Sequence, residues 1–204
     1  TLGLMTQSIL MVGKKHIRTF QNKGTDYRDI IDIIIESYNN SAFIMTSGDD
    51  KKTQGFMCQY KETDWQFIRR ISGLCESILI PLFHENEVRL SYGLPRSAKE
   101  IELKEDFYAS GNHMYDKSKE YEIQGIYHMF FSDEDHEPGT VVKNKGLRFI
   151  ICEKEVSTVE ATLKFHYKVC KEENIKSKRI YNEKIRGLVI SAEVTDVKAE
   201  DIFV

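Results

Sequence analysis

The sequence predicts an α+β fold, in which a small unit with two helices is followed by a β-rich half. Two observations carry this prediction. Apolar residues recur at helical spacing in two segments between residues 24 and 75, and they alternate with the period of a strand from about residue 100 onwards. The 204 residues suffice for one large or two small domains, and 41% hydrophobic with 30% charged residues is an ordinary globular composition.

The first helix is expected to open at Gly24 to Asp26 and to end at Asn39 to Ser41. Its apolar face has a period of 3.6 residues and consists of Tyr27, Ile30, Ile31, Ile34 and Tyr38. Short strands surround the two helices and are expected over residues 4–12, 15–20, 42–46, 56–60, 77–83 and 87–93. The last two of these strands form a predicted hairpin.

The second helix begins with a strong start signal. Thr63 is a good N-cap, and Gln66 follows at the spacing of a capping box. Asp64 adds a negative charge at the positive end of the helix. Phe67, Ile68, Ile71 and Leu74 then share one face, which predicts an amphipathic helix packed on the sheet.

The β-rich half has the period of an antiparallel barrel or sandwich. Its expected strands cover residues 100–104, 121–131, 141–152, 157–170 and 188–197, with a loop over 133–139. On the strand that ends at Cys170, one face is apolar: Leu163, Phe165, Tyr167 and Val169.

Charge and cysteine usage exclude some functions. The net charge of −3 gives no electrostatic footprint for nucleic acid, and the basic run from Lys171 to Lys184 is interrupted by glutamates, as on a solvated face. None of the four cysteines forms a C-x-x-C pair, so reduced, buried thiols are expected rather than a zinc site. No apolar run is long enough to span a bilayer.

Four polar clusters are candidate sites. The stretch 84–87 (HENE) reads as a hairpin tip, and 133–137 (DEDHE) lacks the ligand spacing of a calcium loop. The stretch 111–113 (GNH) has no nucleophile motif beside it. Glu62 and Asp64 could be paired acid–base carboxylates, although capping explains Asp64. We therefore expect no catalytic, metal-binding or cofactor-binding residue and no cofactor.

Three further side chains have open interpretations. Trp65, the only tryptophan, is expected either to anchor its helix to the sheet or to line a subunit interface, with core packing favoured. Arg69 and Arg70 lie at or beyond the border of the apolar stripe. They are either solvated or paired with acidic residues of a neighbouring subunit.

The string QYKETDWQFIRR over residues 59–70 resembles a segment of phage baseplate hub proteins. These include the late-control D family, the hubs of defective phages and R-type bacteriocins, and VgrG-type spikes. The resemblance continues upstream in KHIRTFQN (15–22) with TDY (25–27), and downstream in SILIPLF (77–83) and EVRLSYG (87–93). It is most specific over residues 15–95.

This resemblance implies a structural role, without catalysis, in linking the tail tube to the central spike of a phage tail or phage-like contractile injection particle. It implies a homotrimer in the full-length protein, partners among tail-tube and spike or baseplate proteins, no membrane insertion, and no specific nucleic-acid binding. The expected location is the tail of the particle, after synthesis in the bacterial cytoplasm.

The resemblance also divides the chain. Residues 1–20 would end a truncated N-terminal barrel, 21–96 form the α+β domain, 97–180 form a β-barrel-like hub domain, and 181–204 link to the first strand of an OB-like spike domain. Because the chain starts at Thr1 without an initiator Met, we expect it to be a fragment.

Two other functions remain open at this point. One is a peptidoglycan hydrolase associated with a phage tail, which would need a Cys/His or paired-carboxylate cleft. The other is a carbohydrate- or peptide-binding module, which would expose aromatic residues such as Tyr108, Tyr115 and Tyr127 in a groove.

Overall fold

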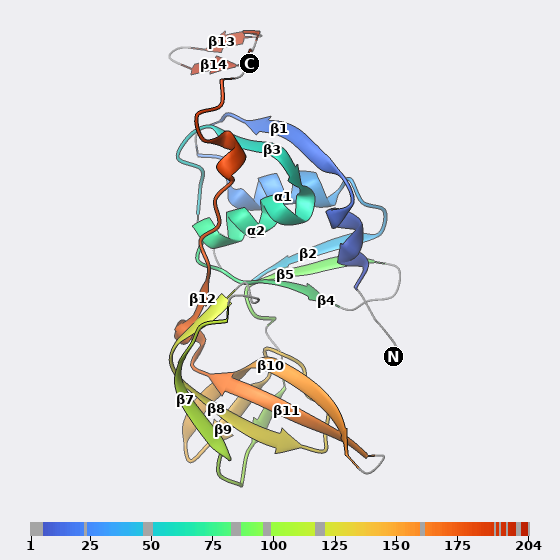
Figure 1. Ribbon diagram of the computed structural model, residues 1–204, viewed down its shortest axis with the longest axis vertical. Coiled ribbons are helices and arrows are strands. Elements are labelled where there is room, and N and C mark those ends of the chain that lie inside the picture. Colours follow the sequence, from blue (N-terminus) through green and yellow to red (C-terminus); the bar gives the residue numbers. More distant parts are fainter. Residues whose placement is uncertain are drawn as a thin grey trace.

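A computed structural model of the chain describes most of its residues. The described ranges are 6–22, 24–46, 51–82, 87–95, 99–116, 121–159, 162–189, 191, 193–194, 196–198 and 201–203. Figure 1 shows two units along the long axis, which we call the helical unit (η1 to β5) and the sheet unit (β6 to β12). The C-terminal segment that follows β12 (Ile175–Ser177) runs back from the sheet unit past α2, and we call it the returning segment. It ends in a small hairpin, β13–β14.

The helical unit has its two helices between two small sheets (Figure 1). Above the helices, β1 (Lys15–Phe20) pairs antiparallel with β3 (Met57–Thr63). Below them lie β2 (Ser41–Met45), β5 (Val88–Tyr92) and β4 (Leu79–Leu82), in the order β2-β5-β4. The predicted hairpin strands are therefore paired, since β4 and β5 run antiparallel.

The two predicted helices are confirmed as α1 (Tyr27–Ile35) and α2 (Asp64–Leu74). Both halves of the capping box exist: the Gln66 N–H donates to Thr63 Oγ1 at 3.2 Å, and the Thr63 N–H donates to Gln66 Oε1 at 3.0 Å. The helices bury their predicted apolar stripes in one core, which contains the residues Ile30, Ile31, Ile34, Ile35, Phe67, Ile68 and Ile71.

The strand predicted over residues 4–12 is wrong where the structure describes it. Residues Gln7–Val12 form the 3-10 helix η1, which buries Ser8 and Met11 and exposes Ile9, Leu10 and Val12. The buried pair is three residues apart, which is one turn of a 3-10 helix. A short apolar run does not separate this period from that of a strand, and only the packing of Met11 into the core decides between them.

The sheet unit is antiparallel except at one edge. Its strands are β6 (Glu100–Glu102), β7 (Ala109–Met114), β8 (Tyr121–Ser132), β9 (Val141–Asn144), β10 (Leu147–Val159), β11 (Thr162–Cys170) and β12 (Ile175–Ser177). Their order is β12-β8-β11-β10-β9-β6, with β7 also on β8, and β6 runs parallel to β9. The chain is mostly β, with the two helices confined to the helical unit. Among the described strands no pairing closes this path, so the sheet is open and the predicted barrel is not confirmed.

Turns move the boundaries of the predicted strands. Lys145 and Gly146 both have positive φ, so they break the predicted strand 141–152 into the hairpin β9–β10. The strand β10 continues to Val159 and pairs antiparallel with β11, so residues 157–159, predicted to begin the next strand, belong to β10. On β11, Phe165, Tyr167 and Val169 are buried as expected, whereas Leu163 near the strand end is exposed.

The C-terminal prediction is wrong in part. Of the expected strand over 188–197, the described residues before Asp196 have no strand conformation. The hairpin pairs β13 (Asp196–Lys198) with β14 (Asp201–Phe203) instead. The structure also contains β7, which the sequence analysis placed in no element.

The returning segment holds the two units together. The Oγ atoms of Ser72 on α2 and Ser177 on β12 lie 3.4 Å apart. Further along, the Asn182 amide donates to Tyr60 O at 2.9 Å, beside the short 3-10 helix η3 (Glu183–Ile185). The segment therefore packs across α2 from the sheet unit to β3, as Figure 1 shows.

Candidate functional site

The polar residues of the β3–α2 corner meet around Asp64. A β-bulge lies in β3, where Lys61 has φ +49 and the register to β1 shifts. The three residues after the bulge, Glu62, Thr63 and Asp64, are all buried. Asp64 is already the first residue of α2, so the alternation of a strand does not extend to it.

Asp64 is fully hydrogen-bonded within the helical unit. Its carboxylate accepts from Gln59 Nε2 at 2.8 Å, from Tyr38 Oη at 2.7 Å and from Arg18. Burial alone would raise the pKa of Asp64, but the hydrogen bonds from Arg18, Gln59 and Tyr38 outweigh it and lower that pKa. This carboxylate therefore joins β1, β3 and the chain after α1 as a buried anion.

Glu62 has a different partner. Arg70 donates to both of its oxygens, and Arg70 Nη2 also donates to Cys58 O at 2.6 Å. Each carboxylate of the suspected pair is thus held by its own arginine, which is the arrangement of a structural corner rather than of an acid–base pair. Arg70 is not solvated, and its partner lies in the same chain.

Trp65 is half-buried and packs against the core of the helical unit, as expected for a helix anchor. The rest of its surface lines a shallow pocket beside η1 whose other residues are Thr6, Ser8, Ile9 and Val12. Trp65 therefore packs against the core, as expected, and also leaves part of its ring accessible in this pocket.

The acidic side chains of the loop 133–137 form ion pairs with lysines of β10 and β11. Lys154 Nζ lies 2.9 Å from Asp135 Oδ1 and 3.0 Å from Glu137 Oε1, and Lys164 pairs with Asp133. The buried His136 contributes its backbone N–H to Tyr167 Oη at 2.7 Å. Within the described ranges, no three His, Cys, Asp or Glu residues are grouped so as to hold a metal ion.

The remaining candidates are dispersed. Residues 84–86 lie outside the described residues, and Glu87 forms an ion pair with Arg89 at 2.7 Å. The stretch 111–113 belongs to β7, where the register shifts and His113 has φ +61. Its residues form part of a strand edge.

The three tyrosines proposed for a groove have different neighbours. Tyr108 stacks on Phe131 with ring centroids 4.1 Å apart. The Tyr115 ring lies under Lys178 Nζ at 4.3 Å, and the Tyr127 ring lies near Lys168 Nζ at 5.3 Å. Each of the three rings therefore has a contact partner of its own.

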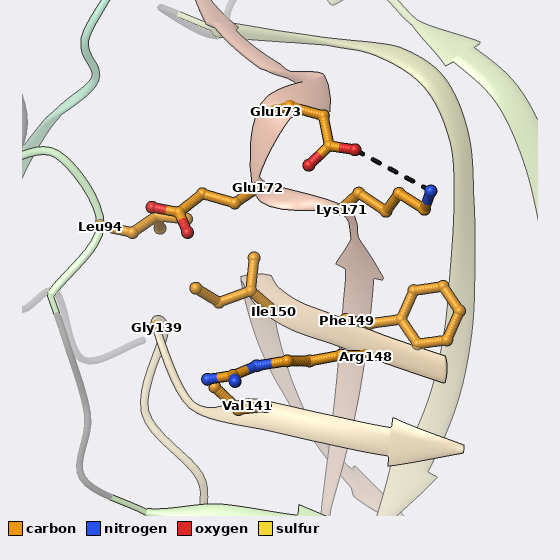
Figure 2. A pocket seen from close by; sticks show the side chains of 9 residues that line it. All are labelled: Leu94, Gly139, Val141, Arg148, Phe149, Ile150, Lys171, Glu172 and Glu173. Carbon is orange, nitrogen blue, oxygen red and sulfur yellow. Dashed lines mark ion pairs between the residues drawn. The ribbon is translucent and has the colours of Figure 1, made fainter. Parts of the chain in front are cut away.

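One pocket lies where the sheet unit meets the loop after β5. It has a volume of about 650 Å³ and is lined by Leu94, Gly139, Val141, Arg148, Phe149, Ile150, Lys171, Glu172 and Glu173. Figure 2 shows the Lys171–Glu173 ion pair, at 3.9 Å, on one side of Ile150 and the Arg148 side chain on the other. Arg148 also pairs with Glu100 at 3.3 Å. The lining offers charge and apolar contact but neither a histidine nor a thiol.

A larger groove of about 1130 Å³ runs between β4 of the helical unit and the outer face of β10 and β11. Its charged groups are mostly paired, as in Lys168–Glu153 at 2.7 Å. At its edge, Ser157 Oγ and His166 Nε2 lie 2.9 Å apart. This pair could not be predicted from the sequence, because only the register of β10 with β11 brings the two residues together.

The Ser157–His166 pair is explained by packing. Its residues face the same side of neighbouring strands, and the His166 ring also contacts Phe131 edge-on at 4.5 Å between centroids. A serine nucleophile further needs a third group that orients the histidine and donors for an oxyanion. The contacts described around this pair supply neither, so we read it as a cross-strand hydrogen bond.

Two solved structures share the fold of this chain. One is the 43 kDa tail protein of prophage MuSo2 from Shewanella oneidensis, with a TM-score of 0.53 and 10% identity over 84% of this chain and 71% of that one. The other is the E. coli c3393 protein, with a TM-score of 0.52 and 13% identity over 80% of this chain. No family model and no curated sequence matches.

The E. coli protein is described as a component of the type VI secretion system with structural similarity to the T4 bacteriophage tail proteins gp27 and gp5. This chain covers 52% of that protein's length. At these identities the likeness establishes the fold. Among the described residues no helix is long and apolar enough to cross a membrane.

Proposed function

We propose that this chain is a structural component of the tail of a phage or of a related contractile injection particle, at the baseplate hub between tail tube and spike. The observation that carries the proposal is that two tail-type proteins share the fold over 84% and 80% of this chain. The likeness spans both the helical unit and the sheet unit, so it concerns their combination in one chain.

The β3–α2 corner supports the same proposal from the sequence side. The string that resembles hub proteins supplies Gln59, Glu62, Thr63 and Asp64, and every one of these polar residues has a structural partner within the helical unit. A motif made of buried structural contacts marks a fold rather than a catalytic centre. That matches a role in assembly.

The exposed apolar side chains fit a protein that assembles with others. Large aliphatic residues are accessible on the helical unit at Ile9, Leu10, Val12 and Ile17. Accessible aliphatic clusters of this kind are common at protein–protein contacts. We propose that in the full-length protein they face neighbouring tail or baseplate subunits around a three-fold axis.

The finer assignments are part of the proposal. The chain would be a late-control D or VgrG-like hub that forms a homotrimer. Residues 1–20 would belong to a first barrel and 21–96 to an α+β domain. Residues 97–180 would form a hub barrel completed by other segments, and a spike domain would begin after residue 181. The open edges of the described sheet are compatible with completion by added strands.

Light scattering on the full-length protein tests the proposal. We expect a trimer that binds a tail-tube protein, with a stable interface of roughly 2,000 Å² or more. A matched variant, Leu10→Asp, would place a charge in the proposed contact and should weaken the trimer while leaving the fold intact. A full-length protein that stays monomeric at high concentration, with no affinity for tube or spike proteins, would exclude a hub role.

A further inference from the structure

The sheet unit contains two cysteines in direct contact. Cys152 on β10 and Cys170 on β11 have Sγ atoms 3.8 Å apart, with the Cys170 thiol donating to Cys152. They lie on neighbouring antiparallel strands at the bulge that follows Ile151, where Cys152 is the extra residue. Both pack in the same apolar cluster, so their side chains point to the same face of the sheet.

We propose that Cys152 and Cys170 are a redox-sensitive pair that closes to a disulfide when the protein meets an oxidising small-molecule disulfide. A disulfide requires two sulfur atoms on one face with Cβ atoms about 3.5–4.5 Å apart. The Sγ atoms of Cys152 and Cys170, now 3.8 Å apart, must approach to about 2.05 Å for the bond to form, and rotation about the Cα–Cβ bonds moves the sulfur atoms in that way. This inference is independent of the tail assignment.

The two thiols differ in access, which sets the order of the reaction. Cys170 is completely buried, whereas Cys152 lines the groove between the units. A disulfide RSSR therefore meets Cys152 first. The Cys152 thiolate attacks one sulfur and RS⁻ leaves, which forms a mixed disulfide at Cys152. Cys170 then loses its proton, attacks Cys152 Sγ and releases the second RSH. In the balance, two protein thiols are oxidised and one RSSR is reduced to two RSH.

The local environment makes the pair slow rather than inert. The hydrogen bond with Cys170 and burial hold the pKa of the Cys152 thiol well above its ordinary value. The Cys152 thiol also donates to Lys168 O at 3.2 Å. Because the thiolate is the attacking species, the rate should rise with pH through the mildly alkaline range. The pair stays reduced in a reducing cytoplasm and closes outside it.

The bridge would sit beneath the contact between the units. The cluster around Cys170 includes Ile123 and Ile175 of the sheet unit as well as Leu94 and Ile80 from the helical side. A covalent link between β10 and β11 at this point would therefore stiffen the junction that sets how the units are held.

The other two cysteines are internal controls. Cys58 lies on β3 and Cys75 at the end of α2, both buried in the helical unit. Treatment of the purified chain with glutathione disulfide at pH 8, followed by denaturation and alkylation with N-ethylmaleimide, counts the remaining thiols by intact mass. We expect two adducts in place of the four that the reduced chain gives, loss of the mass of two hydrogens, and a 152–170 linked peptide.

Variants and stability complete the test. Cys58→Ser with Cys75→Ser should keep the linked peptide, and Cys170→Ser should stop at a glutathione adduct on Cys152. Closure should raise Tm by roughly 5–10 °C. Four adducts after prolonged exposure, a bridge to Cys58 or Cys75, a persistent glutathione adduct in the unmodified chain, or a lower Tm after closure would each overturn the proposal.

Discussion

Arg70 holds both carboxylate oxygens of Glu62, with Nε 2.9 Å from Oε1 and Nη2 2.8 Å from Oε2. The side chains are only 12% and 8% exposed, so this fork lies inside the protein. It joins the strand before the corner to the second turn of α2, and the Arg70 guanidinium also lies 5.0 Å from the Phe67 ring centroid. The fork is thus part of the packing that fixes α2 on β3.

Arg70→Ala should therefore destabilise the fold strongly, by about 3–5 kcal/mol, because it leaves the Glu62 carboxylate buried without its partner. Urea unfolding measures the change. Lys143→Ala is the matched control, since its pair with Glu100 is 46% and 40% exposed, and it should leave stability nearly unchanged. Equal effects of the two substitutions would contradict the structural role of the fork.

Thr63→Ala should cost about 1 kcal/mol, because the Gln66 N–H at the start of α2 loses its side-chain acceptor. Thr63→Ser keeps the hydroxyl and should lose much less. The comparison is made by thermal melts of both variants, and a Thr63→Ala protein as stable as the parent would argue against the cap.

The lowered pKa of Asp64 predicts that the stability of the fold depends on pH. Its folded-state pKa is lowered, so the stability it supplies is present above its ordinary pKa of 3.8 and is lost as pH falls through the lower folded value. Asp64→Asn should thus destabilise the protein by roughly 2–4 kcal/mol at pH 7, with a difference that shrinks below about pH 4. Urea unfolding of both proteins from pH 7 to pH 3 tests the sign. A difference that grows on acidification would refute it.

The close approach of the returning segment to Gly73 allows its attachment to α2 to be tested. A Cβ on Gly73 would lie 2.6 Å from Lys178 O and 3.2 Å from Arg179 Cα, so Gly73→Ala should displace the segment and expose it to protease. A loss of protection in Gly73→Ala would be informative, because Ala in place of Gly otherwise stabilises a helix interior by roughly 1 kcal/mol. Gly55→Ala, where nothing lies within 4 Å, is the control. Faster cleavage near residue 180 only in Gly73→Ala is the expected result.

The chain should not hydrolyse peptidoglycan or generic ester and peptide substrates. Ser157 and His166 are a cross-strand hydrogen bond, and Ser157→Ala should leave every such assay at background. Turnover by the purified chain that disappears in Ser157→Ala or in a His113 variant would favour the hydrolase alternative over the structural one.

Local patterns determined the helices and their start. The stripe of α1, the Thr63–Gln66 spacing and the alternation on β11 each depend on neighbours within a few residues, and the structure reproduces them. These features follow from periodicity because one face of each element must leave water.

Tertiary structure decided what the sequence left open. The run at 7–12 is a 3-10 helix because Met11 packs into the core, and contacts with β1 and across the β3–α2 corner give Asp64 and Glu62 their separate arginines. The contact of Cys152 with Cys170 and that of Ser157 with His166 exist only through the register of β10 and β11. Strand register and long-range pairing depend on residues far apart in the chain. The burial free energy that selects them comes from all the residues of a sheet face together, so no single position reveals it.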